Sequence, residues 1–229
     1  MTPLLYAIIA CLATIFGGLL PLYTKIGDIE VRYLLGFASG VMIATAFFEM
    51  IPEVKIHQNS LMLGIGFFSL YLIEKSVMIH SCPEPECDIH TVGWVAVLGI
   101  GIESLIDGIA IVAGYGIAPA LGLVIAVAVV IHEIPRGFST TVIMKNANYD
   151  QTRTLAALGI DSFLTPVGAI LARFFPLQFF EAMIAFAAGT FIYIGASDLL
   201  PEAHVKFNIK VLLSVISGAI LIPLLETLI

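Results

Sequence analysis

Charge is scarce in this sequence. Asp, Glu, Lys and Arg make up 12% of the 229 residues, which is about half their share of an average soluble domain. The chain therefore has too few charges to solvate a globular surface. Seventeen acidic residues outnumber ten basic ones, and the net charge of −7 excludes a nucleic-acid-binding surface. Three cysteines, Cys11, Cys82 and Cys87, are too few for a disulfide framework.

Apolar residues dominate what is present. They form 59% of the chain, and the mean hydropathy is +1.04. A helix that crosses a bilayer needs about 20 apolar residues, and the chain supplies eight such stretches joined by short connectors. We therefore expect an all-α integral membrane protein in the lipid bilayer, with residues 1–229 forming a single domain. The predicted spans are Pro3–Tyr23, Tyr33–Pro52, Asn59–Ile79, Val92–Gly114, Pro119–Met144, Thr154–Phe174, Phe179–Leu200 and Ile209–Leu228.

The basic residues are unevenly divided between the two sets of connectors. Eight spans put both termini on one side of the membrane, and the side richer in Lys and Arg faces the cytoplasm. The connectors away from the termini carry seven basic residues, and those on the side of the termini carry two. We therefore predict that both termini lie outside. The seven are Lys25, Arg32, Lys75, Lys145, Arg153, Lys206 and Lys210, and the two are Lys55 and Arg173.

The sequence also repeats itself. The segment Gly36–Glu53 aligns without gaps on Ala185–Glu202, so that spans 1–3 correspond to spans 6–8, while spans 4 and 5 have no partner. Because corresponding spans are five helices apart, the two units have opposite orientations, as in the inverted repeats of transporters. The other matches are Thr14 and Gly17 with Thr165 and Gly168, and Gly66 and Glu74 with Gly218 and Glu226.

Spans 4 and 5 carry ionisable residues at the middle of the membrane. Glu103 and Asp107 share one face of span 4, and His132 and Arg136 share one face of span 5, next to Glu133. Each such group costs roughly several kcal/mol unless it is paired or hydrated. Three carboxylates and one guanidinium leave a formal charge of −2, which one divalent cation cancels. This pattern predicts a metal site with Glu103, Asp107, His132 and Glu133 as candidate ligands.

The alternative is a purely structural salt-bridge network. Since spans 4 and 5 are antiparallel, Glu103 should lie level with Arg136, and Asp107 level with His132. A Glu103–Arg136 ion pair is therefore expected. Such a pair still leaves Asp107, Glu133 and His132 unneutralised, which favours a bound metal.

Further acids lie where spans 2 and 7 leave the membrane. Span 2 ends at Glu49 and Glu53, on the outside, and span 7 ends at Asp198, Glu202 and His204, on the inside. Acids near helix ends are often only solvated. Their corresponding places in the repeat favour a role as the two mouths of an ion pathway.

The connector between spans 3 and 4, residues 80–91, is predicted to be cytoplasmic. Two imidazoles and two thiols within it could form a tetrahedral metal site. The alternative is a flexible acidic connector. The four candidate ligands are His80, Cys82, Cys87 and His90.

Four segments carry a resemblance to a known family. His132-Glu133-Ile134-Pro135 resembles the fifth-helix signature of the ZIP (Zrt/Irt-like) metal transporters, and Glu103–Gly108 resembles their fourth-helix His-Asn-x-x-Asp-Gly. Phe48–Glu53 and Asp198–His204 resemble their second- and seventh-helix segments. All four occur in order and on the matching spans, and the resemblance covers nearly the whole chain.

The resemblance implies a 3+2+3 helix bundle that forms a homodimer in the plasma membrane. It also implies proton- or gradient-linked uptake of a divalent metal into the cytoplasm, with spans 1, 4, 5 and 6 moving against spans 2, 3, 7 and 8. We expect Zn²⁺ as cargo first, although Fe²⁺, Mn²⁺, Co²⁺ or Cd²⁺ also fit oxygen ligands with one imidazole. The metal is then cargo, and no cofactor is expected.

The chain departs from the family pattern at several positions. Glu103 and Ser104 stand where family members usually have His and Asn. Arg136 stands where they usually have a metal-binding His or Glu, and an arginine cannot ligate a cation because it stays protonated. Where some bacterial members place a Glu before the proline of span 6, this chain has Thr165, with Asp161 one turn earlier.

From these departures we infer that the guanidinium of Arg136 replaces the second ion of the family's two-metal site. A single metal is then expected. Its predicted ligands are Asp107, His132 and either Glu133 or Glu103. The predicted counter-charges and supporting residues are Arg136, Asp161, Ser104 and Thr165.

Three other functions stay open. In the first, Arg136 fills the site permanently, which leaves a degenerate transporter or a sensor. In the second, the chain is an intramembrane metallohydrolase, because His132-Glu133 begins like a zinc-protease His-Glu-x-x-His helix. Arg136 occupies the place of that motif's second histidine, so we expect a protein that is not an enzyme. The third is a passive channel, whose flux would saturate poorly and ignore pH.

Overall fold

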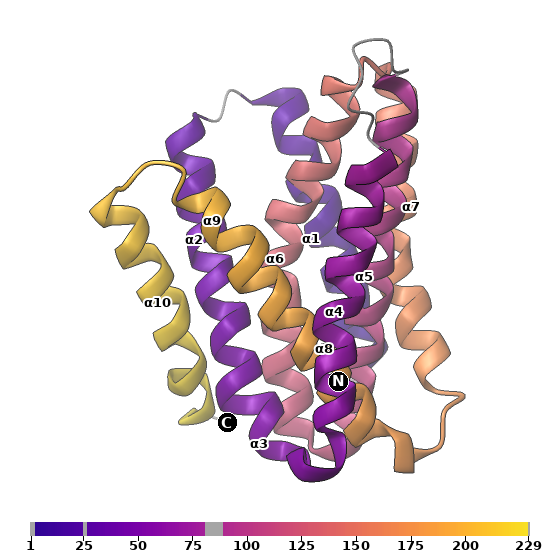
Figure 1. The fold of residues 1–229 in the computed structure, drawn as a ribbon, viewed down its shortest axis with the longest axis vertical. Coiled ribbons are helices and arrows are strands. Elements are labelled where there is room, and N and C mark those ends of the chain that lie inside the picture. Colours follow the sequence, from indigo (N-terminus) through magenta and orange to yellow (C-terminus); the bar gives the residue numbers. More distant parts are fainter. Residues whose placement is uncertain (1–2, 25–26, 81–88, 229) are drawn as a thin grey trace.

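The computed structural model describes residues 3–24, 27–80 and 89–228. Within this part of the chain, eight helical spans are long and apolar enough to cross a membrane (Figure 1). The predicted all-α, eight-span membrane architecture is therefore confirmed. Its elements are α1 (Pro3–Tyr23), α2 (Asp28–Ala44), η1 (Thr45–Met50), α3 (Ile51–Glu53), α4 (Ile56–His80), α5 (Ile89–Ile117), α6 (Pro119–Asn146), α7 (Gln151–Ala172), η2 (Leu177–Phe179), α8 (Phe180–Tyr193), η3 (Ile194–Leu199), α9 (Leu200–Ala203) and α10 (Ile209–Glu226).

The predicted spans differ from the helices mainly at their ends. The sixth span, for example, was expected to begin at Thr154 with the apolar run, but α7 begins at Gln151. The reason is a side-chain cap, because Oδ1 of Asp150 accepts a hydrogen bond of 2.8 Å from the backbone N–H of Arg153. Polar capping residues thus extend the helix beyond the apolar stretch.

The helices alternate in direction, so both ends of the described chain lie at one face of the bundle (Figure 1). We call this the terminal face; α3 ends there at Glu53 and α10 at Glu226. The opposite face, where α6 ends at Asn146 and α9 at Ala203, is the connector face. The described basic residues at or near the connector-face ends of the helices are Arg32, Lys75, Lys145, Arg153, Lys206 and Lys210.

Four helix pairs pack backbone against backbone through glycines. A Cβ atom at Gly17 of α1 would collide with the carbonyl oxygen of Ile134 in α6, and one at Gly137 of α6 would collide with that of Thr14 in α1. Only a hydrogen atom fits at such a contact. The other glycine contacts are Gly108 with Thr165 and Gly168 with Leu105 (α5–α7), Gly40 with Val215 and Gly218 with Phe37 (α2–α10), and Gly66 with Phe186 and Gly189 with Leu63 (α4–α8).

These contacts support the inverted repeat and extend it. Thr14 and Gly17 of α1 align with the contact residues of α7, so their partners on α6 and α5 must correspond as well. Gly137 thus corresponds to Gly108, and Arg136 corresponds to Asp107. The sequence alignment left spans 4 and 5 without partners, whereas the contacts relate these two helices to each other.

Each repeat unit also contains a π-helical segment. These segments, η1 and η3, are each six residues long and begin at Thr45 and Ile194, which are aligned in the repeat. They carry Glu49 and Asp198. We did not expect them from the sequence, and π-helical turns are frequent at functional sites.

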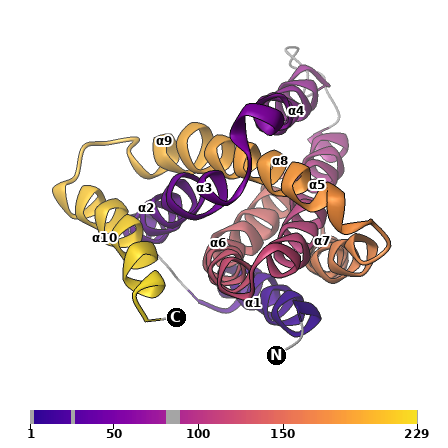
Figure 2. The same ribbon diagram turned by 90° about the horizontal axis from the view of Figure 1, so that it is seen from below.

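The four helix pairs that pack through glycines fall into two groups. Seen from below, α1, α5, α6 and α7 cluster together, while α2, α4, α8 and α10 lie around one side of that cluster (Figure 2). Each of the backbone contacts described above joins two members of the same group. The helices α5 and α6 also contact α8 and α2 of the other group. Movement of one group against the other stays a prediction.

Candidate metal site

The helices α5 and α6 bring the five predicted polar residues of spans 4 and 5 together. Oε2 of Glu103 lies 3.5 Å from Nη2 of Arg136, and Oδ2 of Asp107 lies 3.2 Å from Nε2 of His132. The residues of each pair lie at the same depth in the bundle, as expected for antiparallel spans. The Glu103 side chain is 21% exposed, whereas the other members of this cluster, including Glu133, are buried.

Arg136 lies at the centre of the cluster. Its Nη1 atom is 2.7 Å from Oδ2 of Asp107 and 2.9 Å from Oε1 of Glu133, and its Nη2 atom is 2.8 Å from Nε2 of His132. The ion pair with Glu103, which we expected from the sequence, is longer than those with Asp107 and Glu133. We expected the guanidinium to act as a counter-charge next to the candidate ligands. Instead it contacts three of them directly.

Asp107, His132 and Glu133 present three potential ligand atoms that lie within 4.8 Å of one another. Nδ1 of His132 lies 2.9 Å from the Ala128 carbonyl oxygen, so we assign Nδ1 as the donor and Nε2 as the unprotonated nitrogen. Its lone pair faces the carboxylate of Asp107, and such an arrangement needs a positive charge close by. Arg136 supplies that charge here, and a divalent transition metal can take the same three ligand atoms.

Two threonines hold the carboxylate of Glu133. Oγ1 of Thr14 in α1 donates to Oε2 over 2.5 Å, and Oγ1 of Thr165 in α7 donates to Oε1 over 3.1 Å. Each repeat unit supplies one of these donors, because Thr14 and Thr165 are aligned. Thr165 was among the predicted supporting residues, but Thr14 was not. Its match to Thr165 in the repeat was the signal that could have identified it.

Asp161 of α7 is a fully buried carboxylate that lies beside the cluster. It accepts hydrogen bonds of 2.7 Å from Oγ of Ser104 and 2.8 Å from Oγ1 of Thr140. Ser104 in turn accepts a hydrogen bond of 3.1 Å from Arg136. Asp161 is thus linked to the guanidinium through Ser104. Thr140 was not among the predicted supporting residues.

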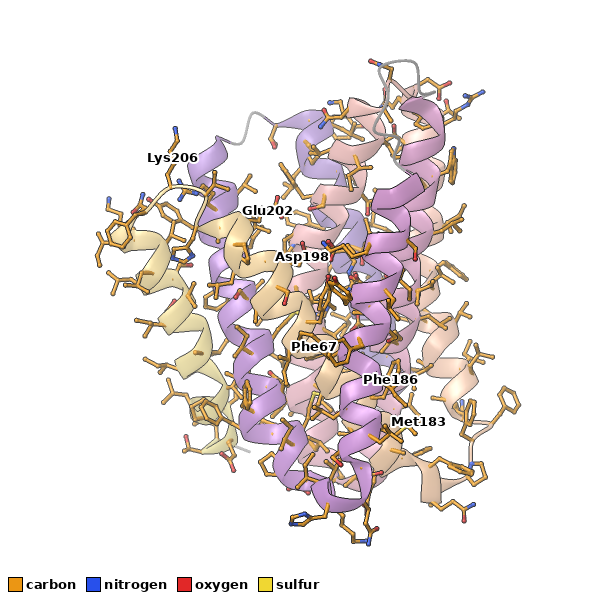
Figure 3. All side chains as sticks on the ribbon, viewed as in Figure 1. Phe67, Met183, Phe186, Asp198, Glu202 and Lys206 are labelled. Carbon is orange, nitrogen blue, oxygen red and sulfur yellow. The ribbon has the colours of Figure 1, made fainter. Side chains whose placement is uncertain are left out.

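A cavity of about 410 Å³ leads from the cluster toward the connector face. Glu103, His132 and Arg136 line one part of it, and Asp198 and Glu202 line another. Asp198, Glu202 and Lys206 lie at successive heights, from the middle of the bundle to the connector face, whereas Phe67, Phe186 and Met183 lie on the side of the terminal face (Figure 3). The cavity therefore runs from the cluster toward one face, with acidic residues on its wall.

The two predicted mouths differ in their relation to this cavity. Asp198 and Glu202 line it, whereas His204 follows α9, with Nδ1 lying 3.2 Å from the Leu200 carbonyl oxygen, and does not line it. Glu49 in η1 and Glu53 in α3 lie toward the terminal face and are likewise absent from the lining of this cavity.

Tyr193 and Glu74 form a hydrogen-bonded pair in the cavity that was not among the predicted site residues. The hydroxyl of Tyr193 donates a hydrogen bond to Oε2 of Glu74, and both side chains line the cavity. The match of Glu74 to Glu226 in the repeat was the available signal. The predicted loop site, with His80, Cys82, Cys87 and His90, lies outside the described residues and side chains.

The fold and the site together define a multi-pass helical membrane protein with a buried cluster of metal-ligand type at the inner end of a cavity. Residues 79–226, well over half of the chain, match the family of ZIP zinc transporters. The chain belongs to this family, so the resemblance inferred from the four sequence segments is confirmed.

Several curated relatives are similar to this chain. Zinc transporter ZIP13 of Pongo abelii is 23% identical over 207 residues, which cover 79% of this chain and 61% of that protein. Zinc transporter foi of Drosophila melanogaster is 30% identical over 130 residues, or 54% of this chain and 17% of foi. Metal cation symporter ZIP14 of Mus musculus is 31% identical over 122 residues, which cover 51% of this chain and 24% of that protein. The chain thus spans between 17% and 61% of these relatives' lengths.

Proposed function

We propose that this protein carries a divalent transition metal across the membrane through the cluster on α5 and α6. The observation that supports this function is the meeting of Asp107, His132 and Glu133, with ligand atoms within 4.8 Å, beside a cavity that His132 lines together with Glu103 and Arg136. Family membership and the names of the relatives favour Zn²⁺ as the cargo. Fe²⁺, Mn²⁺, Co²⁺ and Cd²⁺ fit the same ligand types.

The proposed direction is into the cytoplasm. The excess of basic residues near the connector face favours this face as the cytoplasmic one, with both termini outside a plasma membrane. The cavity then opens inward, and metal leaves past Asp198 and Glu202, both of which line it. A homodimer, as the resemblance implies, is part of the proposal.

The position of Arg136 supports a single-ion site with an internal competitor. The guanidinium contacts the same three side chains that would hold the metal. For the metal to bind, Arg136 must leave them, and Glu103 is its nearest remaining carboxylate partner, 3.5 Å away at the cavity. We propose that Arg136 moves toward Glu103 when metal binds and returns when metal leaves. The three side chains then always have a cation beside them, which is the metal in the loaded state and Arg136 in the empty state.

Uptake into proteoliposomes tests the proposed function. The wild type and the variants Asp107→Ala, His132→Ala and Asp150→Ala are reconstituted and given a panel of Zn²⁺, Fe²⁺, Mn²⁺, Co²⁺ and Cd²⁺. We expect uptake by the wild type and by Asp150→Ala, which changes an exposed helix cap. Asp107→Ala and His132→Ala should lose uptake. Equal uptake by all four proteins would refute the site assignment.

A second candidate function is a degenerate transporter or a sensor. The close contacts of Arg136 favour it, because a guanidinium that never leaves keeps metal out of the site. The same assay separates the two functions. A wild type that takes up no metal, together with an Arg136→Ala variant that does, would identify Arg136 as a permanent block. The hydrolase alternative gains no support, since the family is one of transporters.

A further inference from the structure

Two acidic triads occupy corresponding positions at opposite faces of the bundle. Asp198, Glu202 and Glu74 line the cavity that leads to the connector face. In the internal repeat, these three residues align with Glu49, Glu53 and Glu226. We call the first set the cavity triad and the second set the terminal triad.

The members of each triad lie on neighbouring parts of the structure. Asp198, Glu202 and Glu74 line one cavity, and η1, which carries Glu49, contacts α3, which carries Glu53. The terminal triad is assembled from distant parts of the chain, since α10, which ends at Glu226, contacts η1, which carries Glu49. The inverted repeat thus produces the same grouping of acids twice.

Glu49 distinguishes the terminal triad from a group of solvated surface acids. Its side chain is only 8% exposed, and Oε1 has no hydrogen-bond partner among the described residues. A buried carboxylate oxygen without a partner is costly unless a cation is close. Lys55, a basic residue of this face, is paired with Glu181 over 3.2 Å. A cation bound from solution would give the buried oxygen of Glu49 the partner that it lacks among the described residues.

Packed core separates the terminal triad from the central cluster. Met50, which follows Glu49 in η1, and Phe191, whose ring lies 5.7 Å from that of His132, are fully buried in the same apolar core. The two sites are therefore distinct. A cation bound at the triad could reach the central cluster only after this packing opens.

We propose that Glu49, Glu53 and Glu226 form a divalent-cation site at the terminal face, as the symmetry counterpart of the cavity triad. This proposal rests on the proposed transport function and adds the place where metal is first captured. The triad offers only carboxylate oxygens, which suit hard divalent ions such as Mn²⁺. The central cluster, with one imidazole, then receives the ion.

Counting bound Mn²⁺ on the purified full-length chain in detergent tests this site. Free Mn²⁺ gives a sharp six-line electron paramagnetic resonance spectrum that broadens on binding, so a titration counts the sites. We expect Glu49→Gln and Glu226→Gln each to lose one equivalent relative to the wild type. Glu181→Gln, a change near the same face but outside the triad, should lose none. Because Glu226 is exposed, its variant tests the triad even if the buried substitution at Glu49 impairs folding.

The variant Asp107→Ala separates this inference from the proposed function. Asp107→Ala should lose a different equivalent, so that Asp107→Ala combined with Glu226→Gln loses two. If Glu226→Gln and a folded Glu49→Gln bind as much Mn²⁺ as the wild type, the terminal site is refuted, whatever Asp107→Ala does. If only Asp107→Ala binds as much as the wild type, the central site fails and the terminal site stands.

Discussion

Asp107 and Arg136 occupy corresponding positions on two helices related by the internal repeat, and their side chains form an ion pair of 2.7 Å in the buried cluster. Each is followed by a glycine, Gly108 or Gly137, that packs against a neighbouring backbone. The repeat therefore places a candidate ligand on α5 and its competitor on α6 at equivalent positions. One position thus offers a carboxylate, and the other offers a guanidinium.

Replacing Arg136 tests its role as a competitor. In Arg136→Gln, the buried carboxylates of Asp107 and Glu133 lose their partner, so the metal-free protein should unfold more easily, by about 3–5 kcal/mol. Added Zn²⁺ or Mn²⁺ should restore the stability and raise the melting temperature of the variant more than that of the wild type. Thermal unfolding in detergent, with and without metal, measures both effects.

Arg153→Gln serves as the control for this prediction. The Arg153 side chain is 63% exposed, and its ion pair with Asp150 is 3.9 Å long. This variant should match the wild type in both measurements. A smaller metal-induced stabilisation in Arg136→Gln than in the wild type would show that Arg136 supports metal binding instead of competing with it.

The threonines that hold Glu133 should affect metal affinity without touching the metal. Thr14→Val and Thr165→Val keep the side-chain shape but each remove one donor to the carboxylate. Loss of such an orienting hydrogen bond typically lowers metal affinity by about 10–100-fold. Thr24→Val is the matched control, since Thr24, which follows α1, has an exposed hydroxyl that donates to the Leu20 carbonyl oxygen of that helix. Equal metal affinity in the two buried variants and the control would exclude an orienting role.

Glycine contacts between helices should be sensitive to one methyl group. In Gly137→Ala, the new Cβ meets the carbonyl oxygen of Thr14, so α1 and α6 must separate and the melting temperature should fall. Gly159→Ala is the control, because nothing lies within 4 Å of a Cβ at that position of α7. In that open helical position alanine should stabilise by about 1 kcal/mol. A Gly137→Ala variant as stable as Gly159→Ala would contradict the close packing.

Cysteine labelling tests the sidedness of the cavity. Ser139 of α6 lines the cavity, whereas the next residue, Thr140, is fully buried against Asp161. In a background without native cysteines, Ser139→Cys should react with a polar, membrane-impermeant thiol reagent added at the connector face. Thr140→Cys should not react. Labelling of Ser139→Cys only from the terminal face would reverse the proposed route.

The spans and the central cluster could be predicted from the sequence because their signals are strong. Long apolar runs define the helices, and charged residues inside such runs stand out. The levels of Glu103 with Arg136 and of Asp107 with His132 followed from antiparallel geometry, and both contacts are present. Helix-capping residues outside the apolar runs, such as Asp150, shifted the helix ends.

Other features depend on three-dimensional packing that sequence spacing does not encode. The π-helical segments leave no mark in the hydrophobic pattern. The long side chain of Arg136 can reach several acids, and only the packed structure determines that it approaches Asp107 and Glu133 more closely than Glu103. Thr14 reaches Glu133 because a glycine contact brings α1 against α6.

The central position of Arg136 also has an electrical consequence. In a carrier of the proposed kind, the empty site must return across the membrane, and every uncompensated charge that it carries then couples to the transmembrane voltage. That coupling amounts to about 2.3 kcal/mol per elementary charge for each 100 mV. The guanidinium cancels one negative charge among the acids that it contacts. The empty return step should therefore depend less on membrane voltage than it would with a neutral residue at position 136.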